Sequence, residues 1–427
     1  MRNLFPVLLL ALALPACGEG GTDPENPNMD EARSDKQRVT SPNVSDQDLA
    51  TQVAGNSAFA FDLYQELRAQ DKGNLFYSPY SISAALAMVH GGARGATETQ
   101  SEQVMHYRLA QARLHPVFNK IDLELESRGQ GKKAADGQPF RLRVANAVWG
   151  QRDYHFEQAY LDTIAVNYGA GLRLMDFASQ PEPSRKVINQ WVEQETESRI
   201  KDLIPQGAID AATRFVLTNA VYFNAAWADQ LEEEATRDGA FNLLDGSTVT
   251  VPMMSGEIRA SYVDAGDYAA AALPYDGHEL SMVLIVPRSG RFDAVEATLT
   301  GGAIDALVQQ LGTAHVRLKL PRFEFETDYT LNRHLEALGM TDAFSAAKAD
   351  FSGITGNREL YIGLVKHKAF IKVNEQGTEA AAATAVVMPG SAMPEVKELT
   401  VDRPFIFLIR DHATGVIVFV GRVVDPS

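Results

Sequence analysis

Apolar residues recur along the chain with two different periods, which predict a mixture of helices and strands. Helical spacing marks residues 49–68, 81–90 and 188–203, the second of them the more buried. Strand-like runs come mostly later, at residues 215–223, 280–286, 316–325, 361–373 and 404–424. Helices first and sheets later predict an α+β fold, and no internal repeat or change of composition divides this part of the chain.

The beginning of the chain carries an export signal. Residues 4–16 are almost wholly apolar and follow Arg2, but they are too few to cross a bilayer as a helix, so residues 1–16 are expected to be a signal peptide. The run ends Leu14-Pro15-Ala16-Cys17-Gly18, which resembles the bacterial lipobox. This resemblance implies acylation of Cys17 and an outer-membrane lipoprotein of the bacterial cell envelope. Plain secretion after Ala16, giving an extracellular protein, is the alternative.

Residues 17–47 are expected to form a lipidated cysteine followed by a flexible tether. The segment consists mainly of Gly, Pro, Asn, Asp, Glu and Ser, and so has little apolar surface to offset the entropy lost on ordering. The folded domain is therefore expected to span residues 48–427.

Composition excludes several kinds of function. The net charge of −16 argues against nucleic acid as a partner. A single cysteine excludes a disulfide within the chain, and the nine histidines are never paired at metal-ligand spacing, so neither a metal nor another cofactor is expected. The chain contains no Gly-x-Ser-x-Gly elbow, and no catalytic residues are expected because no set of nucleophile, base and acid is recognisable.

Four stretches match one family in order and together cover nearly all of residues 48–427. They are Asn74-Leu-Phe-Tyr-Ser78-Pro79 with its continuation to Thr97, Val144-Ala-Asn146-Ala-Val-Trp149, the segment from Ile188 to Trp227, and His367-Lys368 through Glu375-Gln376-Gly377-Thr378 to Thr384. On these motifs the chain resembles the serpins, which are serine protease inhibitors. The resemblance implies three β-sheets, about nine helices and an exposed reactive loop at about residues 375–394.

Family members act as single-use traps for serine proteases, which form a covalent acyl complex with the cleaved loop before the loop inserts into the central sheet. The predicted hinge of this loop suits insertion, because a glycine allows a sharp bend and small side chains follow on one face. It comprises Glu375, Gly377, Thr378, Ala380, Ala382 and Thr384. Two other interpretations remain: the alanines could form a helix, or the chain could be a non-inhibitory binding or scaffold lipoprotein with this fold.

The bond attacked by the protease follows from the family's spacing. Fourteen residues past Gly377 lies Ser391, so the first candidate is the Ser391–Ala392 bond. Counting back from Arg403 gives Met393 instead, and Met388 is a further candidate. Because none of these residues is Lys or Arg, an elastase-like or subtilisin-like target is expected. The inhibitor itself is expected to be a monomer.

Four polar residues match the family's positions where the central sheet parts: Ser78, Ser81, Asn219 and His367. Hydroxyl, amide and imidazole groups there could bond across the gap and exchange partners on opening. The alternative is that Ser78 only caps a helix and His367 is an ordinary core histidine.

Overall fold

The structure is a computed structural model that describes residues 30–129, 141–378 and 396–427. Its α-helices are α1 (Asp46–Gln70), α2 (Pro79–His90), α3 (Gly95–Val104), α4 (Gln111–Glu126), α5 (Gln158–Tyr168), α6 (Pro181–Glu195), α7 (Phe292–Ala297), α8 (Gly301–Gln310), α9 (Asn332–Ala337) and α10 (Ser352–Thr355). Among the described residues, none of these helices combines the length and the apolar character that crossing a membrane requires.

The strands form two hydrogen-bonded sheets. They are β1 (Asp30–Ala32), β2 (Leu75–Tyr77), β3 (Arg141–Gln151), β4 (Leu172–Met175), β5 (Phe215–Ala226), β6 (Arg237–Asn242), β7 (Thr248–Asp264), β8 (Tyr268–Pro274), β9 (Leu280–Pro287), β10 (Gly312–Pro321), β11 (Phe323–Thr330), β12 (Leu364–Asn374), β13 (Gly377–Thr378), β14 (Val396–Thr400), β15 (Phe405–Asp411) and β16 (Ile417–Val423). The central sheet has seven strands in the order β1-β4-β3-β5-β13-β12-β11. The second has nine, in the order β14-β10-β7-β8-β9-β15-β16-β2 with β6 beside β7.

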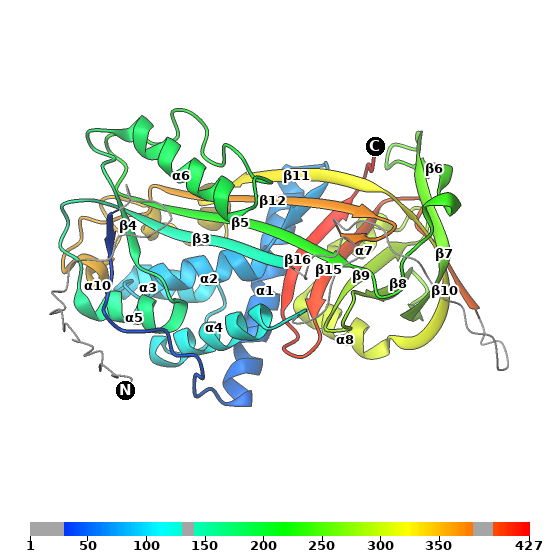
Figure 1. The fold of residues 1–427 in the computed structure, drawn as a ribbon, viewed down its shortest axis with the longest axis horizontal. Coiled ribbons are helices and arrows are strands. Elements are labelled where there is room, and N and C mark those ends of the chain that lie inside the picture. Colours follow the sequence, from blue (N-terminus) through cyan, green and yellow to red (C-terminus); the bar gives the residue numbers. More distant parts are fainter. Residues whose placement is uncertain (1–29, 130–140, 379–395) are drawn as a thin grey trace, which may run out of the picture.

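Helices cover both faces of the central sheet, with α6 on one side and α2 on the other (Figure 1). All twelve residues of β5 are buried, because its side chains alternate between these two layers. Val216 and Ala220 pack in a cluster with Trp191 of α6, whereas Leu217 and Val221 belong to the main core. This position explains why β5 reads as a continuous apolar run.

Helix α2 contacts β3 and β5 of the central sheet and β16 of the second, and every one of its twelve residues is buried. It begins at a strong start signal: Ser78 is the N-cap, its hydroxyl accepts from the Ser81 amide, and Pro79 takes the first helical position. Its first turn contacts the middle of the central sheet, where the Ser81 hydroxyl donates to Asn146 of β3 at 3.1 Å.

Most predicted elements differ from the structure by a few residues at their ends, and two differ by more. The helix expected over 188–203 starts at Pro181 and ends at Glu195, because Glu197 and Ser198 adopt positive φ angles of 51° and 62°. The strand expected over 316–325 is in fact two strands in different sheets. The chain leaves β10 at Pro321, which has no N–H to extend the ladder, and β11 begins at Phe323.

The expected third sheet is continuous with the second. Strand β7 is seventeen residues long and pairs with β6 and β10 along most of its length but with β8 near its end. One long strand thus joins what the family resemblance described as separate sheets. The α+β class itself is confirmed.

The ordered body starts earlier than predicted, because residues 30–45 pack against it. Strand β1 pairs antiparallel with β4 at the edge of the central sheet. The Ser34 hydroxyl then donates to Asp162 of α5 at 2.6 Å, and helix α1 begins at Asp46 with Ser45 as its N-cap. The tether prediction was wrong for this part of residues 17–47; residues 17–29 lie outside the described ranges.

Asn119 of α4 fixes this N-terminal segment from the other side. Its amide oxygen accepts from Arg38 Nε at 2.9 Å, and its amide nitrogen donates to the Val39 carbonyl at 2.7 Å. The Arg38 guanidinium also pairs with Asp122 at 2.6 Å and with Glu126 at 3.1 Å. The composition of the segment hid this order, because hydrogen bonds and ion pairs, rather than large apolar side chains, hold it in place.

Candidate functional site

The middle of the central sheet contains a pair of parallel strands that part at one end. Strands β5 and β12 pair directly, with Val216–Val221 opposite Leu364–Ala369. Beyond that stretch β13 stands between them, antiparallel to both, with Thr378 opposite Ala225 on one side and Val373 on the other. The chain leaves β12, reverses through Glu375 and Gln376, and enters the gap from its end (Figure 1).

Asn374 and Gly377 determine this reversal. The side-chain oxygen of Asn374 accepts from the amides of Gln376 at 3.1 Å and Gly377 at 3.2 Å, which is an Asx-type turn. A Cβ atom at Gly377 would lie 2.2 Å from the carbonyl oxygen of Ala225. The glycine is therefore required by close approach to β5 as well as by the bend predicted from the sequence.

Glu375 is a buried carboxylate at the turn, with 1% of its surface exposed. Arg322 Nε donates to its two oxygens at 2.7 and 2.9 Å, and the Thr236 hydroxyl donates to the same carboxylate. The Glu375 carbonyl accepts from the Leu231 amide at 2.8 Å. The negative charge is thus compensated, and the turn is tied to the segment that follows β5.

Two aromatic rings line the same end of the gap. The Trp227 amide donates to the Gln376 carbonyl at 2.8 Å, and its indole N–H donates to the Asn374 carbonyl at 3.0 Å. The ring stacks on Tyr275 with centroids 4.7 Å apart, and the Tyr275 hydroxyl bonds to the Thr378 hydroxyl at 2.8 Å. Burial raises the pKa of Tyr275 above its ordinary range, so the hydroxyl keeps its proton.

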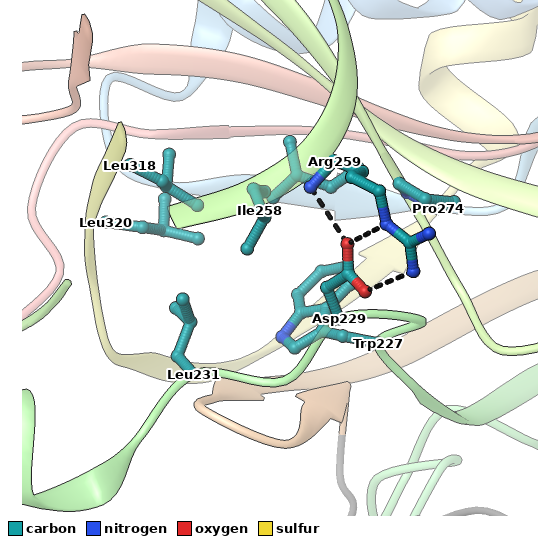
Figure 2. Close-up of a pocket in the computed structure, with 9 residues that line it drawn as sticks. Trp227, Asp229, Leu231, Ile258, Arg259, Pro274, Leu318 and Leu320 are labelled. Atoms are coloured by element: carbon teal, nitrogen blue, oxygen red, sulfur yellow. Dashed lines mark hydrogen bonds and ion pairs between the residues drawn. The ribbon is translucent and has the colours of Figure 1, made fainter. Parts of the chain in front are cut away.

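A small, mainly apolar pocket adjoins Trp227, and Figure 2 shows its lining. Asp229 and Arg259 cross one side of it, with Arg259 Nε 3.2 Å and Nη2 3.0 Å from the two carboxylate oxygens. The Arg259 guanidinium lowers the pKa of Asp229. This ion pair joins the segment after β5 to β7. It therefore connects the open end of the gap between β5 and β12 to the second sheet.

The four residues predicted at the parting of the sheet do lie together, around the stretch where β5 and β12 pair directly. His367 and Asn219 are opposite each other on β12 and β5, and the Asn219 side chain bonds to the His367 ring and to the Ser81 hydroxyl, the latter at 2.5 Å. The Ser78 amide donates to His367 Nε2 at 3.3 Å. One network thus joins both strands to the N-terminus of α2.

Hydrogen bonding also assigns the proton of His367. Because Nε2 accepts from the Ser78 amide, Nδ1 carries the hydrogen and donates to the Asn219 side-chain oxygen. The ring is fully buried, and burial lowers the pKa of His367 to about 3. The imidazole is therefore neutral at neutral pH.

Sequence reasoning missed several members of these clusters. Asn146 of β3 lies opposite Asn219, accepts from its amide nitrogen and from the Ser81 hydroxyl, and was noticed only as part of a motif. Trp227 was likewise noticed only at a motif's end. Arg322 and Tyr275 gave no signal, because they lie 53 and 103 residues from their partners Glu375 and Thr378.

The remaining predicted site residues lie outside the described ranges. They are Cys17, Ala380, Ala382, Thr384, Met388, Ser391, Ala392 and Met393. Of the predicted hinge, the structure therefore places Glu375, Gly377 and Thr378 at the open end of the gap, and it places the four residues Ser78, Ser81, Asn219 and His367 at its closed part.

Comparison with known proteins gives one consistent result. A family model described as Serpin (serine protease inhibitor) matches residues 54–426. A serpin-like protein of Thermococcus kodakarensis is 40% identical, covering 87% of this chain and 85% of that protein. Leukocyte elastase inhibitor A of Mus musculus is 38% identical, covering 87% and 99%. Tengpin, a thermophilic serpin in its native state, superposes with a TM-score of 0.81 at 29% identity, covering 93% and 99%.

Proposed function

The chain belongs to the serpin family, whose members are mostly protease inhibitors rather than catalysts, and on this premise we propose that it traps serine proteases as a suicide substrate. The observation that carries this proposal is the position of β13. Gly377 and Thr378 occupy the gap between β5 and β12 in register with both strands. A chain that continued in the same direction would separate the residues that now pair directly and become a full strand between them.

The proposed reaction begins as ordinary proteolysis. The hydroxyl of the protease's catalytic serine attacks the scissile carbonyl of the loop, the C–N bond breaks, and the new amine leaves with a proton from the protease's histidine. The part of the loop before the cut stays attached to the protease as an ester. Insertion of that part into the central sheet carries the protease along before water hydrolyses the ester, and the added backbone hydrogen bonds and burial stabilise the product.

The described hinge residues support insertion. Thr378 is buried with its hydroxyl on Tyr275, so a small polar side chain fits the position that enters the sheet first. Ala380, Ala382 and Thr384 would follow on the same face, and all are small.

We propose that the network of Ser78, Ser81, Asn219 and His367 acts as a gate in this process. Parting β5 from β12 must break the contact between His367 and Asn219, which joins the two strands. The polar groups could then bond to the incoming backbone, which would lower the cost of opening.

The proposed targets are proteases of elastase or subtilisin type. The candidate residues Met388, Ser391, Ala392 and Met393 are small or apolar, which suits a shallow apolar specificity pocket. Relatives 37–38% identical to this chain are named leukocyte elastase inhibitors, which agrees with that choice. Mass spectrometry of the C-terminal fragment released on cleavage would identify the bond.

We propose that lipidation of Cys17 holds the inhibitor at the bacterial envelope. The lipobox-like Leu14-Pro15-Ala16-Cys17 motif supports this proposal. Cys17→Ser should then move the protein from the membrane fraction to the soluble fraction. Unchanged fractionation would contradict lipidation and would leave the inhibitory proposal intact.

The inhibitory proposal is tested by mixing the protein with pancreatic elastase or with subtilisin and running denaturing gels. A covalent complex is expected with active protease and none with protease whose serine has been blocked. Thr378→Arg should convert the inhibitor into a substrate that is cleaved while the protease stays active, because a charged side chain would have to enter the buried gap. Thr250→Arg, at an exposed strand position, is the matched control and should still form the complex. Cleavage without any complex in the unmodified protein would refute the proposal.

A further inference from the structure

Far along α2 from the gate, three side chains that can bind metals meet where α2 ends and α3 begins. One ring nitrogen of His90 and one carboxylate oxygen each of Glu98 and Glu102 lie within 4.8 Å of one another. Glu98 and Glu102 are four residues apart on α3, so they share one face of that helix. His90 is the last residue of α2, where the helix dipole favours positive charge.

Hydrogen bonding leaves one nitrogen of His90 without a partner. The Ser101 hydroxyl donates to the Glu98 carbonyl at 2.8 Å, so at 2.7 Å from His90 Nδ1 it must accept the ring's hydrogen. Nε2 then carries the lone pair. It is buried and has no hydrogen-bond partner among the described residues, and only 2% of His90 is exposed.

An unpartnered buried acceptor costs free energy that a ligand could recover. Because Nδ1 carries the ring's hydrogen, the lone pair on Nε2 is available to a cation. The ring nitrogen is thus in the protonation state that metal coordination needs.

The carboxylate of Glu98 is held by a hydrogen bond, and both Glu98 and Glu102 are partly shielded from solvent. The Gln111 amide donates to Glu98 at 2.8 Å and to the His90 carbonyl at 2.9 Å, which fixes one carboxylate relative to the end of α2. The ligand oxygens of Glu98 and Glu102 lie within 4.8 Å of each other, and two negative charges at that distance repel. A cation between them would remove this repulsion.

We propose that His90, Glu98 and Glu102 bind one divalent transition-metal ion. Nε2 of His90 and one oxygen from each carboxylate serve as ligands, and the remaining positions are open to water. An imidazole beside carboxylates suits Zn²⁺, Mn²⁺ or Fe²⁺, whereas Mg²⁺ and Ca²⁺ prefer oxygen ligands alone. Ser101 orients the ring through Nδ1, as the outer partners of metal-bound histidines commonly do. The sequence prediction of no metal considered pairs of histidines and so overlooked this mixed set.

Calorimetric titration of the metal-free full chain with Zn²⁺ tests the site. One saturable site is expected in the unmodified protein, with Kd at least tenfold weaker in His90→Gln and in the double variant Glu98→Gln/Glu102→Gln. The control is His155→Gln, which alters an exposed histidine 3.8 Å from Glu157 and should leave Kd unchanged. Cys17 is present in every variant, so any binding to it is constant across the comparison. Mg²⁺ should give no saturable heat.

Ser101→Ala separates the proposed geometry from simple attraction to acidic residues. Loss of the Nδ1 contact should weaken Zn²⁺ binding by about tenfold while the charges stay the same. Because Glu98 and Glu102 are only partly buried, their double variant should fold even if a His90 variant does not. Zn²⁺ binding that is unchanged in the double variant would overturn the site, and binding that is unchanged or tighter in Ser101→Ala would overturn coordination through Nε2.

Discussion

Gly377 approaches Ala225 so closely that a Cβ atom at position 377 would lie 2.2 Å from the Ala225 carbonyl oxygen. The contact is with backbone on both sides of the gap, since Gly377 also lies opposite Asn374 of β12. Strand β13 can stand between β5 and β12 only because residue 377 has no side chain.

Gly377→Ala should therefore destabilise the protein by about 1–3 kcal/mol, because either β13 or β5 must shift to make room. Urea unfolding measures the loss. Gly302→Ala is the matched control: a Cβ there meets nothing within 4 Å, and in the first turn of α8 alanine should be neutral or stabilising by up to about 1 kcal/mol. Equal stability of the two variants would contradict the close packing of β13.

In the ion pair of Arg322 and Glu375, removing the arginine alone should lower the free energy of unfolding more than removing both charges. Arg322→Met leaves the buried Glu375 carboxylate without its main counter-charge and should cost about 3 kcal/mol. Adding Glu375→Gln to that variant should restore part of the loss, because a neutral amide is cheaper to bury than a lone charge.

The exposed ion pair of Arg317 and Glu398 serves as the comparison. Both side chains are more than half exposed, and Arg317→Met should change the free energy of unfolding by less than about 1 kcal/mol. If Arg322→Met cost no more than Arg317→Met, the carboxylate of Glu375 would have to be reaching water.

His367 predicts how acid affects stability. Its pKa is lowered to about 3 in the fold, whereas an unfolded histidine titrates near 6.5. Between these values the unfolded chain binds a proton that the folded chain does not, so stability is full above about pH 6.5 and falls as the pH drops toward 3. The slope contributed by this one group reaches about 1.4 kcal/mol per pH unit.

Replacing His367 with Asn should remove that slope, although the variant will be less stable at neutral pH because it loses the contacts with Ser78 and Asn219. Urea unfolding at several values between pH 5 and 7 compares the slopes. His155→Asn, at an exposed ring in contact with water, should keep the slope of the unmodified protein. A His367→Asn protein with an unchanged slope would mean that the ring of His367 binds a proton as readily in the fold as in the unfolded chain.

The sequence correctly predicted features that depend on residues close together in the chain. The apolar run of β5 and the cap of α2 at Ser78 are both local signals, and the neighbouring residues Ser81, Asn219 and His367 lie within motifs. It did not predict features that depend on polar contacts between residues far apart in the chain. Arg322 finds Glu375 across the sheet, and a proline marks the change of sheet between β10 and β11 inside a run that otherwise reads as one strand.

The N-terminal segment shows the same limit and yields the last prediction. Asn119 is fully buried and makes two hydrogen bonds to residues 38 and 39, so Asn119→Ala should cost about 2 kcal/mol. The backbone around Arg38 and Val39, together with β1, should then become more accessible to proteases. Asn167→Ala, which removes only a bond to Thr163 within α5, is the control and should cost little. Limited proteolysis followed by N-terminal sequencing would locate the first cuts. Cuts within residues 30–45 at equal rates in both variants would mean that Asn119 does not hold the segment, and that the pairing of β1 with β4 must be sufficient by itself.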